Sequence, residues 1–329
     1  MSANGFCFKH GLDPEFMGKL ETLAKRPGWF ADVLADAELV LGIRNNYINV
    51  YWRGCSLFKI DRDGKSGALR FSTHPKYLLN ADLSAPVALV PESGEWKFTL
   101  NAIEALRNRY EGPETLAGMK QAAKYYAGAE KKGLHPIICD LDNNVIDTEI
   151  TFDRQGQSEG ERRSTQRVDI ACLEEVESSI RLRFWEAKLY ENDELWRGKD
   201  NVIDQVTRYR EKLEEHRDEV LNSYRLVAKN LHEIAQWSGG SRNIGALVQE
   251  VAKEKRPLVL DDTPFIGLIV FGFDEAQKKS ERWEKRRQKL EQELFQRPSG
   301  HRRGLIPRGD PKGLRLRAGP ALSSSAVGA

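Results

Sequence analysis

Two charged residues in the middle of an apolar stretch are the strongest chemical signal of this chain. Glu186 and Lys188 belong to residues 179–190, where β-branched and aromatic residues alternate with charged ones and no helical period is present. This pattern is typical of a strand, and residues two apart on a strand point to the same face. Because a Glu and a Lys in a buried sheet are costly to desolvate without a partner, the pair predicts a functional site.

A second strand is predicted at residues 166–173, with Asp169 near its start. Residues 174–178 between the two strands are polar and few enough for a hairpin. Asp169 and Glu186 are therefore expected on neighbouring strands, close enough to share one divalent cation, and carboxylate oxygens are preferred ligands of Mg²⁺. Lys188 is expected beside that cation.

The segment after these strands adds a third element, because Gln205 and Tyr209 are four residues apart at the start of a predicted helix. Asp169, the triplet from Glu186 to Lys188 and this Gln-Tyr pair together resemble the D…ExK…QxxxY signature of the PD-(D/E)xK nuclease superfamily, in particular its RecB-type branch. The resemblance covers residues 113–273. It departs from the superfamily pattern at Val168, where a Pro often stands.

The resemblance implies a metal-dependent nuclease that hydrolyses phosphodiester bonds, with DNA as the substrate and nucleic acid as the partner. Asp169, Glu186 and the backbone carbonyl of Ala187 would hold Mg²⁺ or Mn²⁺. Lys188, with a pKa lowered by burial, would orient or deprotonate the attacking water and offset the charge of the phosphorane.

Further residues complete the expected site. Gln205 and Tyr209 would position Lys188 or the substrate strand, since they lie one helical turn apart. The superfamily commonly has another carboxylate on the first helix or first strand. We choose Glu149, on a strand predicted at residues 145–152, and Glu130 and Glu104 are the alternatives.

Other interpretations remain open. A lone Glu-x-Lys is also found as a surface ion pair, and the chain could be a catalytically inactive nucleic-acid-binding module or a protein-interaction module built on the same core. For nucleic acid we consider Arg208 and one face of a predicted strand with Tyr47, Tyr51 and Arg53, where aromatic rings could stack on bases. The alternative for this face is an ordinary solvated sheet surface.

The predicted fold class is α/β, with a restriction-endonuclease-like core whose mixed central sheet is flanked by helices. Residues 1–95 would form a small N-terminal α+β domain of a helix and an antiparallel meander, ending in a connection at 82–95 that contains Pro86, Pro91 and Gly94. Residues 96–273 would form the core, including a helix from Pro113 to Lys131 that Gly133 closes.

Residues 274–329 would form a charged helix, a candidate surface for a second copy or a protein partner, and a disordered basic tail. From 298 onward the chain has six basic residues and one acidic residue, which give net +5 and leave −3 of the overall +2 for residues 1–297. Gly, Pro and Ser in this tail favour disorder, and its charge suits either a phosphate-binding arm or a passive extension.

Composition excludes several other classes of function. The four cysteines have no zinc-like spacing, none follows the QxxxY helix where an iron-sulfur cluster would need it, and Lys59 replaces the glycine that a nucleotide-binding phosphate loop requires. We therefore expect no zinc, iron-sulfur cluster or nucleotide. No apolar run reaches the length of a membrane span and the first residues lack a signal-peptide core, so a cytoplasmic protein is expected.

Overall fold

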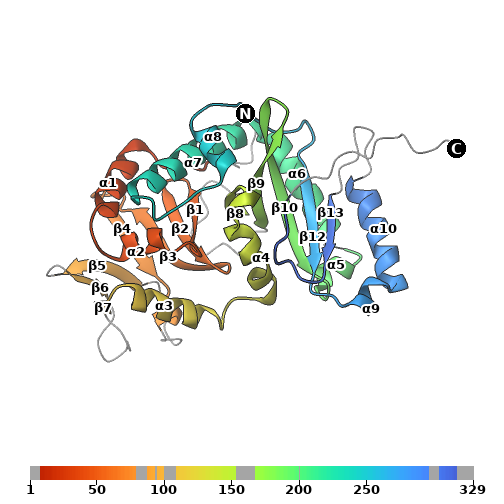
Figure 1. Ribbon diagram of the computed structural model, residues 1–329, viewed down its shortest axis with the longest axis horizontal. Coiled ribbons are helices and arrows are strands. Elements are labelled where there is room, and N and C mark those ends of the chain that lie inside the picture. The colour runs from red at the N-terminus through yellow and green to blue at the C-terminus, as the bar shows by residue number, and fades with distance from the viewer. Residues whose placement is uncertain are drawn as a thin grey trace.

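Two sheets organise the chain (Figure 1), and the structure, a computed structural model, describes residues 8–78, 87–92, 95–99, 109–152, 167–199, 201–295 and 304–316. The first sheet has seven strands in sequence order, each pairing antiparallel with the next. These strands are β1 Val40–Arg44, β2 Tyr47–Trp52, β3 Cys55–Arg62, β4 Leu69–Thr73, β5 Val87–Glu92, β6 Glu95–Phe98 and β7 Arg109–Tyr110.

Two N-terminal helices pack on this sheet. Helix α1 (Pro14–Ala24) begins after Asp13, whose carboxylate accepts a hydrogen bond from the Phe16 amide at 2.8 Å. Helix α2 (Trp29–Ala35) follows, and its Trp29 is fully buried against Phe58 and Phe71 of the sheet. A short 3-10 helix, η1 (Pro75–Leu78), follows β4.

The predicted connection at residues 82–95 is wrong in its second half, because β5 and β6 are strands of the first sheet. Pro91 is tolerated there because β4 pairs only with the first two residues of β5, so the missing amide proton of Pro91 breaks no bond to β4. The sheet then continues to β7, beyond residue 95.

The second sheet is mixed, with β8, β9 and β10 forming an antiparallel meander and β12 and β13 running parallel to β10. Its strands are β8 Val145–Thr151, β9 Arg167–Val176, β10 Ser179–Leu189, β11 Leu258–Val259, β12 Ile266–Phe271 and β13 Leu305–Arg308. The predicted hairpin between β9 and β10 is confirmed.

Helices cover both faces of the second sheet. The helices after the first sheet are α3 Pro113–Ala123, α4 Ala129–Cys139, α5 Asp193–Trp196, α6 Val202–Glu215, α7 Arg217–Trp237, α8 Ala246–Ala252, α9 Glu275–Lys278 and α10 Glu281–Phe295, with the 3-10 turn η2 Leu141–Asn143 after α4. Of these, α3 packs beside the first sheet, against α2, η1 and β3. Helix α4 packs on one face through Leu134 and Ile137, which contact Trp185 and Ala187. None of the helices in the described ranges is long and apolar enough to cross a membrane.

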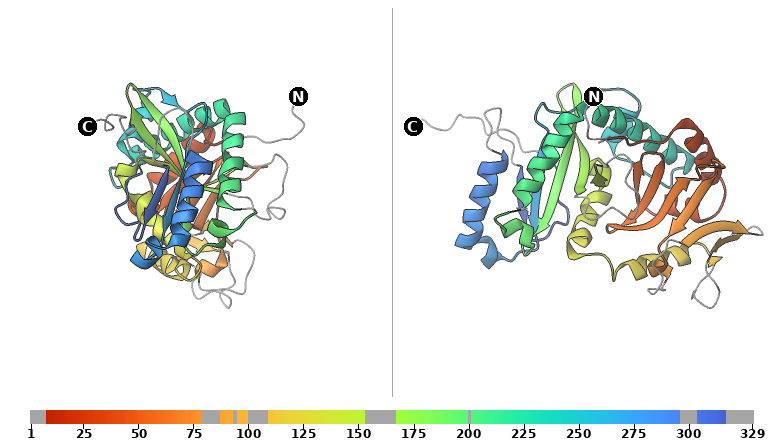
Figure 2. Two further views of the ribbon diagram at one scale, coloured as in Figure 1. Left: turned by 90° about the vertical axis from the view of Figure 1, so that its right-hand side faces the viewer. Right: turned by 180° about the vertical axis from the view of Figure 1, so that it is seen from behind.

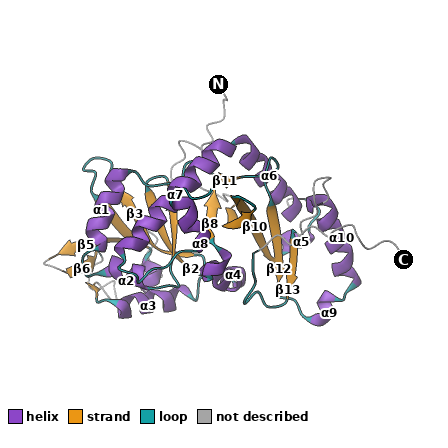
Figure 3. Ribbon diagram, turned by 45° about the horizontal axis from the view of Figure 1, so that its top comes forward, coloured by secondary structure: helices purple, strands orange, loops and turns teal. Residues whose placement is uncertain are grey.

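Helices α6 and α7 connect the two sheets. Figure 2 shows α6 lying along the second sheet, and Figure 3 shows α7 between α1 and α8, both of which it contacts. The two helices are separated at His216, because α6 ends at Glu215 and α7 begins at Arg217.

The single helix predicted from Pro113 to Lys131 is instead two helices, and Gly133 lies inside the second. A Cβ at Gly133 would lie 2.3 Å from the Phe271 ring, so glycine allows α4 to approach the sheet rather than ending a helix. The turn between α3 and α4 consequently places the first turn of α4 at one end of the second sheet.

The prediction of a disordered tail from residue 298 is wrong for residues 304–316. Strand β13 pairs with β12, and Leu314 and Leu316 are buried beside α4. Leucines interspersed among the basic residues supply this packing, although the average composition of the tail is polar. Helix α10 likewise buries Trp283, Leu290 and Leu294, although its sequence is charged at most positions.

Candidate functional site

Three acidic residues lie side by side across three strands of the second sheet. Ile170 of β9 pairs with Trp185 of β10 and with Thr148 of β8, so the next position along each strand brings Glu149, Asp169 and Glu186 into one line. Their exposures are 5%, 4% and 1%. We call these three residues the carboxylate row, and the predicted proximity of Asp169 to Glu186 follows directly from the strand pairing.

Asp169 is held in place by the neighbouring strand and by a lysine. Its Oδ2 accepts a hydrogen bond from the Ala187 amide at 2.8 Å. Its Oδ1 lies 2.5 Å from Nζ of Lys131, and the same Nζ lies 2.7 Å from Oε1 of Glu149. Lys131 therefore bridges two members of the carboxylate row.

Lys131 comes from the first turn of α4. Burial alone would lower the pKa of Lys131, but Asp169 and Glu149 raise it well above the ordinary value, so the side chain carries a full positive charge. No sequence pattern singles out Lys131, apart from its position next to Glu130. Gly54 makes room for it, since a Cβ there would lie 2.8 Å from Cγ of Lys131.

The Lys188 ammonium lies between two carboxylates, 2.8 Å from Oε1 of Glu186 and 2.7 Å from Oε2 of Glu194 in α5. Although burial would lower the pKa of Lys188, these two carboxylates raise it above the usual value. The expectation of a lowered pKa is therefore wrong, because it considered burial without the two acidic neighbours. Glu194 was not predicted from the sequence.

Glu186 is the most deeply buried member of the carboxylate row. Its Oε2 has no hydrogen-bond partner among the described residues. Burial, followed by the charge of Asp169, raises the pKa of Glu186 well above its ordinary value. A cation beside Oε2 would lower the pKa of Glu186 again, because a positive charge stabilises the ionised carboxylate.

Gln205 and Tyr209 contact each other on α6, where Nε2 of Gln205 lies 3.2 Å from the Tyr209 hydroxyl. Burial, and then the charge of Glu186, raises the pKa of Tyr209, so its hydroxyl stays protonated. Oε1 of Gln205 has no partner in the part of the chain described. Arg208 is half-buried on the adjacent face of the helix.

Three residues were considered for the additional carboxylate of the site, and two of them, Glu149 and Glu130, lie there. Glu149 belongs to the carboxylate row, and Oε2 of Glu130 accepts hydrogen bonds from the Leu189 amide at 3.2 Å and from Nδ2 of Asn192 at 3.1 Å. Burial and the charge of Asp169 raise the pKa of Glu130. Glu104 lies outside the described residues.

The orientation of Glu149 depends on a buried arginine of the first sheet. Glu149 has φ 55°, an uncommon conformation for this residue type inside a strand. Nη2 of Arg44 donates to the carbonyl oxygens of Thr148 at 2.5 Å and Glu149 at 3.2 Å, while Nη1 lies 2.7 Å from Asp147. Arg44 thus fixes the bend in β8 that carries Glu149.

The predicted nucleic-acid face on β2 is not formed. Tyr51 is buried with 6% exposure, and its hydroxyl accepts from Nδ2 of Asn49 at 3.0 Å. The Arg53 guanidinium stacks on Trp52, 4.5 Å from the ring centroid. Tyr47 is half-buried, so these residues do not present an open aromatic strip.

Comparisons with protein-family models, curated proteins and solved structures found no match to this chain. Among the described residues, no group of three or more His, Cys, Asp or Glu side chains is already arranged to hold a metal ion. In the carboxylate row, the Lys131 ammonium lies between the Asp169 and Glu149 carboxylates, so these groups are paired with a lysine rather than arranged around a metal ion. A functional assignment therefore depends on the chemistry of the side chains at this end of the second sheet.

Proposed function

We propose that this chain is a metal-dependent nuclease that hydrolyses phosphodiester bonds in DNA. The observation that carries the proposal is the buried carboxylate row with the Lys188 ammonium beside it, at the positions that the D…ExK pattern singled out. The order of α4, an antiparallel meander of three strands, α6 and a parallel strand supports a restriction-endonuclease-like core.

The donor set fits a hard divalent cation such as Mg²⁺ or Mn²⁺. Asp169, Glu186 and Glu149 offer carboxylate oxygens, with the Ala187 carbonyl as the implied fourth donor. The unpartnered Oε2 of Glu186 supports this fit, because a buried carboxylate oxygen without a hydrogen bond is costly. When bound, the metal would supply Lewis-acid polarisation of the scissile phosphate and of the attacking water.

The remaining residues would stabilise charge and position the substrate. Because its pKa is raised, Lys188 serves as a fixed positive charge for the phosphorane rather than as a proton acceptor. Glu194 holds that ammonium from the solvent side, independently of the protonation of Glu186. The Tyr209 hydroxyl and the free oxygen of Gln205 can orient the water or the substrate strand.

Cleavage of supercoiled plasmid and of end-labelled oligonucleotides tests this proposal. With Mg²⁺ or Mn²⁺ the wild-type protein should cut and EDTA should stop it. Asp169→Asn and Glu186→Gln should bind DNA without cutting, while Glu233→Gln, an exposed position on α7, should cut like wild type. A folded wild-type protein that cuts neither substrate with either metal would overturn the proposal.

A second candidate is a nucleic-acid-binding module on the same core that does not cut. The observation that favours it is Lys131, whose ammonium already forms ion pairs with both Asp169 and Glu149. DNA binding with no metal-dependent cleavage, and no change in melting temperature on adding Mn²⁺, would support this alternative.

A further inference from the structure

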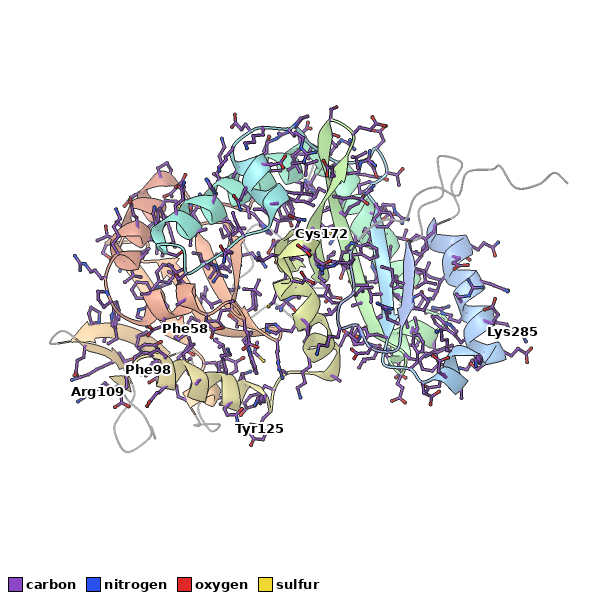
Figure 4. The ribbon with its side chains drawn as sticks, viewed as in Figure 1. Phe58, Phe98, Arg109, Tyr125, Cys172 and Lys285 are labelled. Atoms are coloured by element: carbon purple, nitrogen blue, oxygen red, sulfur yellow. The ribbon has the colours of Figure 1, made fainter. Side chains whose placement is uncertain are left out.

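The turn between α3 and α4 carries two consecutive exposed aromatic side chains. Tyr125 is 86% exposed and Tyr126 is 44% exposed, and Tyr125 is the most exposed large hydrophobic residue in the described part of the chain. Figure 4 shows Tyr125 at the lower edge of the molecule, on the outer side of the ribbon. An exposed aromatic pair of this kind is apolar surface that a partner can cover.

One lysine contacts the pair, and two others lie near it in the sequence. Nζ of Lys76 lies 4.8 Å from the centroid of the Tyr126 ring and 5.0 Å from that of Tyr77. Lys124 and Lys132 are exposed, and neither forms an ion pair with a carboxylate of the described residues. We call Lys76, Lys124, Tyr125, Tyr126 and Lys132 the tyrosine-lysine surface.

The tyrosine-lysine surface borders the carboxylate row. Lys132 follows Lys131 directly in the first turn of α4, and Lys131 contacts Asp169 and Glu149. A chain bound on the surface would therefore need only a short path to the carboxylate row.

We propose that the tyrosine-lysine surface binds single-stranded nucleic acid and leads it to the carboxylate row. Aromatic rings stack on unpaired bases of any sequence, and unpaired lysines bind the phosphates between those bases. A duplex keeps its bases stacked inside, so it cannot use Tyr125 and Tyr126 in this way. The inference rests on the proposed function, because it names the substrate class of the same site.

Fluorescence anisotropy with a labelled oligothymidylate, in EDTA so that no cutting occurs, tests the proposal. Tyr125→Ala should weaken binding by a factor of about 5 to 100, and Tyr125→Phe, which keeps the ring, should bind like wild type. Lys132→Glu should weaken binding and reduce the salt dependence of the affinity. The matched control is Lys255→Glu, an exposed position after α8, and α8 lies at the upper edge of the molecule in Figure 1, whereas α3 lies at the lower edge; this variant should change neither.

Unchanged oligothymidylate affinity in Tyr125→Ala would overturn the inference, as would a loss that is equally large for a duplex of the same length. A change of oligomeric state in Tyr125→Ala with unchanged oligonucleotide binding would also overturn it, and would assign the surface to a second copy. The nuclease proposal fails separately: a protein whose binding depends on Tyr125 but which never cuts would leave this inference standing.

Discussion

Lys131→Met is the substitution that distinguishes a metal site from a permanent ion pair. The substitution removes the ammonium between Asp169 and Glu149, whose side chains are 5% and 6% exposed, while keeping most of the lysine stem. Removing one partner of a buried ion pair costs roughly 3–5 kcal/mol. Because Lys131 is itself 28% exposed, we expect the lower end of this range, a destabilisation of about 3 kcal/mol without metal. For a chain of 329 residues this lowers the melting temperature by about 4 °C.

Thermodynamic linkage converts this loss into a metal affinity. If a divalent cation replaces the ammonium between the carboxylates, the metal-bound forms of wild type and variant differ little in stability. The metal-free variant is less stable by about 3 kcal/mol, so the variant should bind the metal more tightly than wild type by about two orders of magnitude. Saturating metal should accordingly raise the melting temperature of the variant more than that of wild type.

Melting curves in EDTA and in a Mn²⁺ series, together with calorimetric titration of Mn²⁺, measure both quantities. Lys132→Met is the matched control, since Lys132 is the next residue, exposed and without a carboxylate partner. Equal Mn²⁺ affinity in Lys131→Met and wild type would refute the competition between lysine and metal. A weaker affinity in the variant would refute it as well, because Lys131 would then support metal binding.

Three further predictions concern catalysis, pH and the C-terminal segment. Lys188→Ala should lower the cleavage rate by a factor of about 10² to 10⁴ while DNA affinity and Mn²⁺ binding stay unchanged, and a variant that cuts at the wild-type rate would exclude a role in the transition state. Burial lowers the pKa of His135 to about 4 from 6.5, and its Nδ1 accepts from the Arg53 amide. Because the unfolded chain binds this proton first, the free energy of unfolding should fall by up to about 3 kcal/mol between pH 6.5 and 4, and urea melts of His135→Asn should lack this contribution. In the same urea melts, Leu314→Ala should lower the free energy of unfolding by about 2–4 kcal/mol, because Leu314 is buried. Lys312→Ala, at an exposed position, should have little effect. Equal free energies of unfolding for the two variants would show that residues 304–316 do not pack as described.

The sequence was informative wherever a local pattern fixes a local structure. The alternation around Glu186 predicted β10, and the few polar residues after β9 predicted the hairpin that pairs β9 with β10. Strand pairing then brought Asp169 and Glu186 together without further information, because side chains opposite each other on neighbouring strands share a face.

The errors arose where distant segments decide the environment of a residue. Lys188 has a raised pKa because Glu194 approaches it from α5, and no spacing in β10 reveals that contact. Tyr51 lies on the face of β2 that we considered as a nucleic-acid surface, but its side chain is buried. Residues 304–316 are polar on average, yet Leu314 and Leu316 are buried because they pack in one apolar cluster with residues of the second sheet and α4.

The first sheet has a structural part in the site that its own sequence does not suggest. Arg44 at the end of β1 is fully buried, and Asp147 of β8 is its counter-ion, so the pair would be costly if either partner were lost. The same guanidinium binds the Thr148 and Glu149 carbonyls and so stabilises the positive φ that Glu149 requires. An ion pair on the surface would stabilise the protein equally well at a lower desolvation cost, so stability alone does not explain the buried pair. The bend in β8, in contrast, places Glu149 beside Lys131 and Asp169. We infer that the packing of the first sheet against β8 serves to orient Glu149, a member of the carboxylate row. The two sheets therefore form one functional unit.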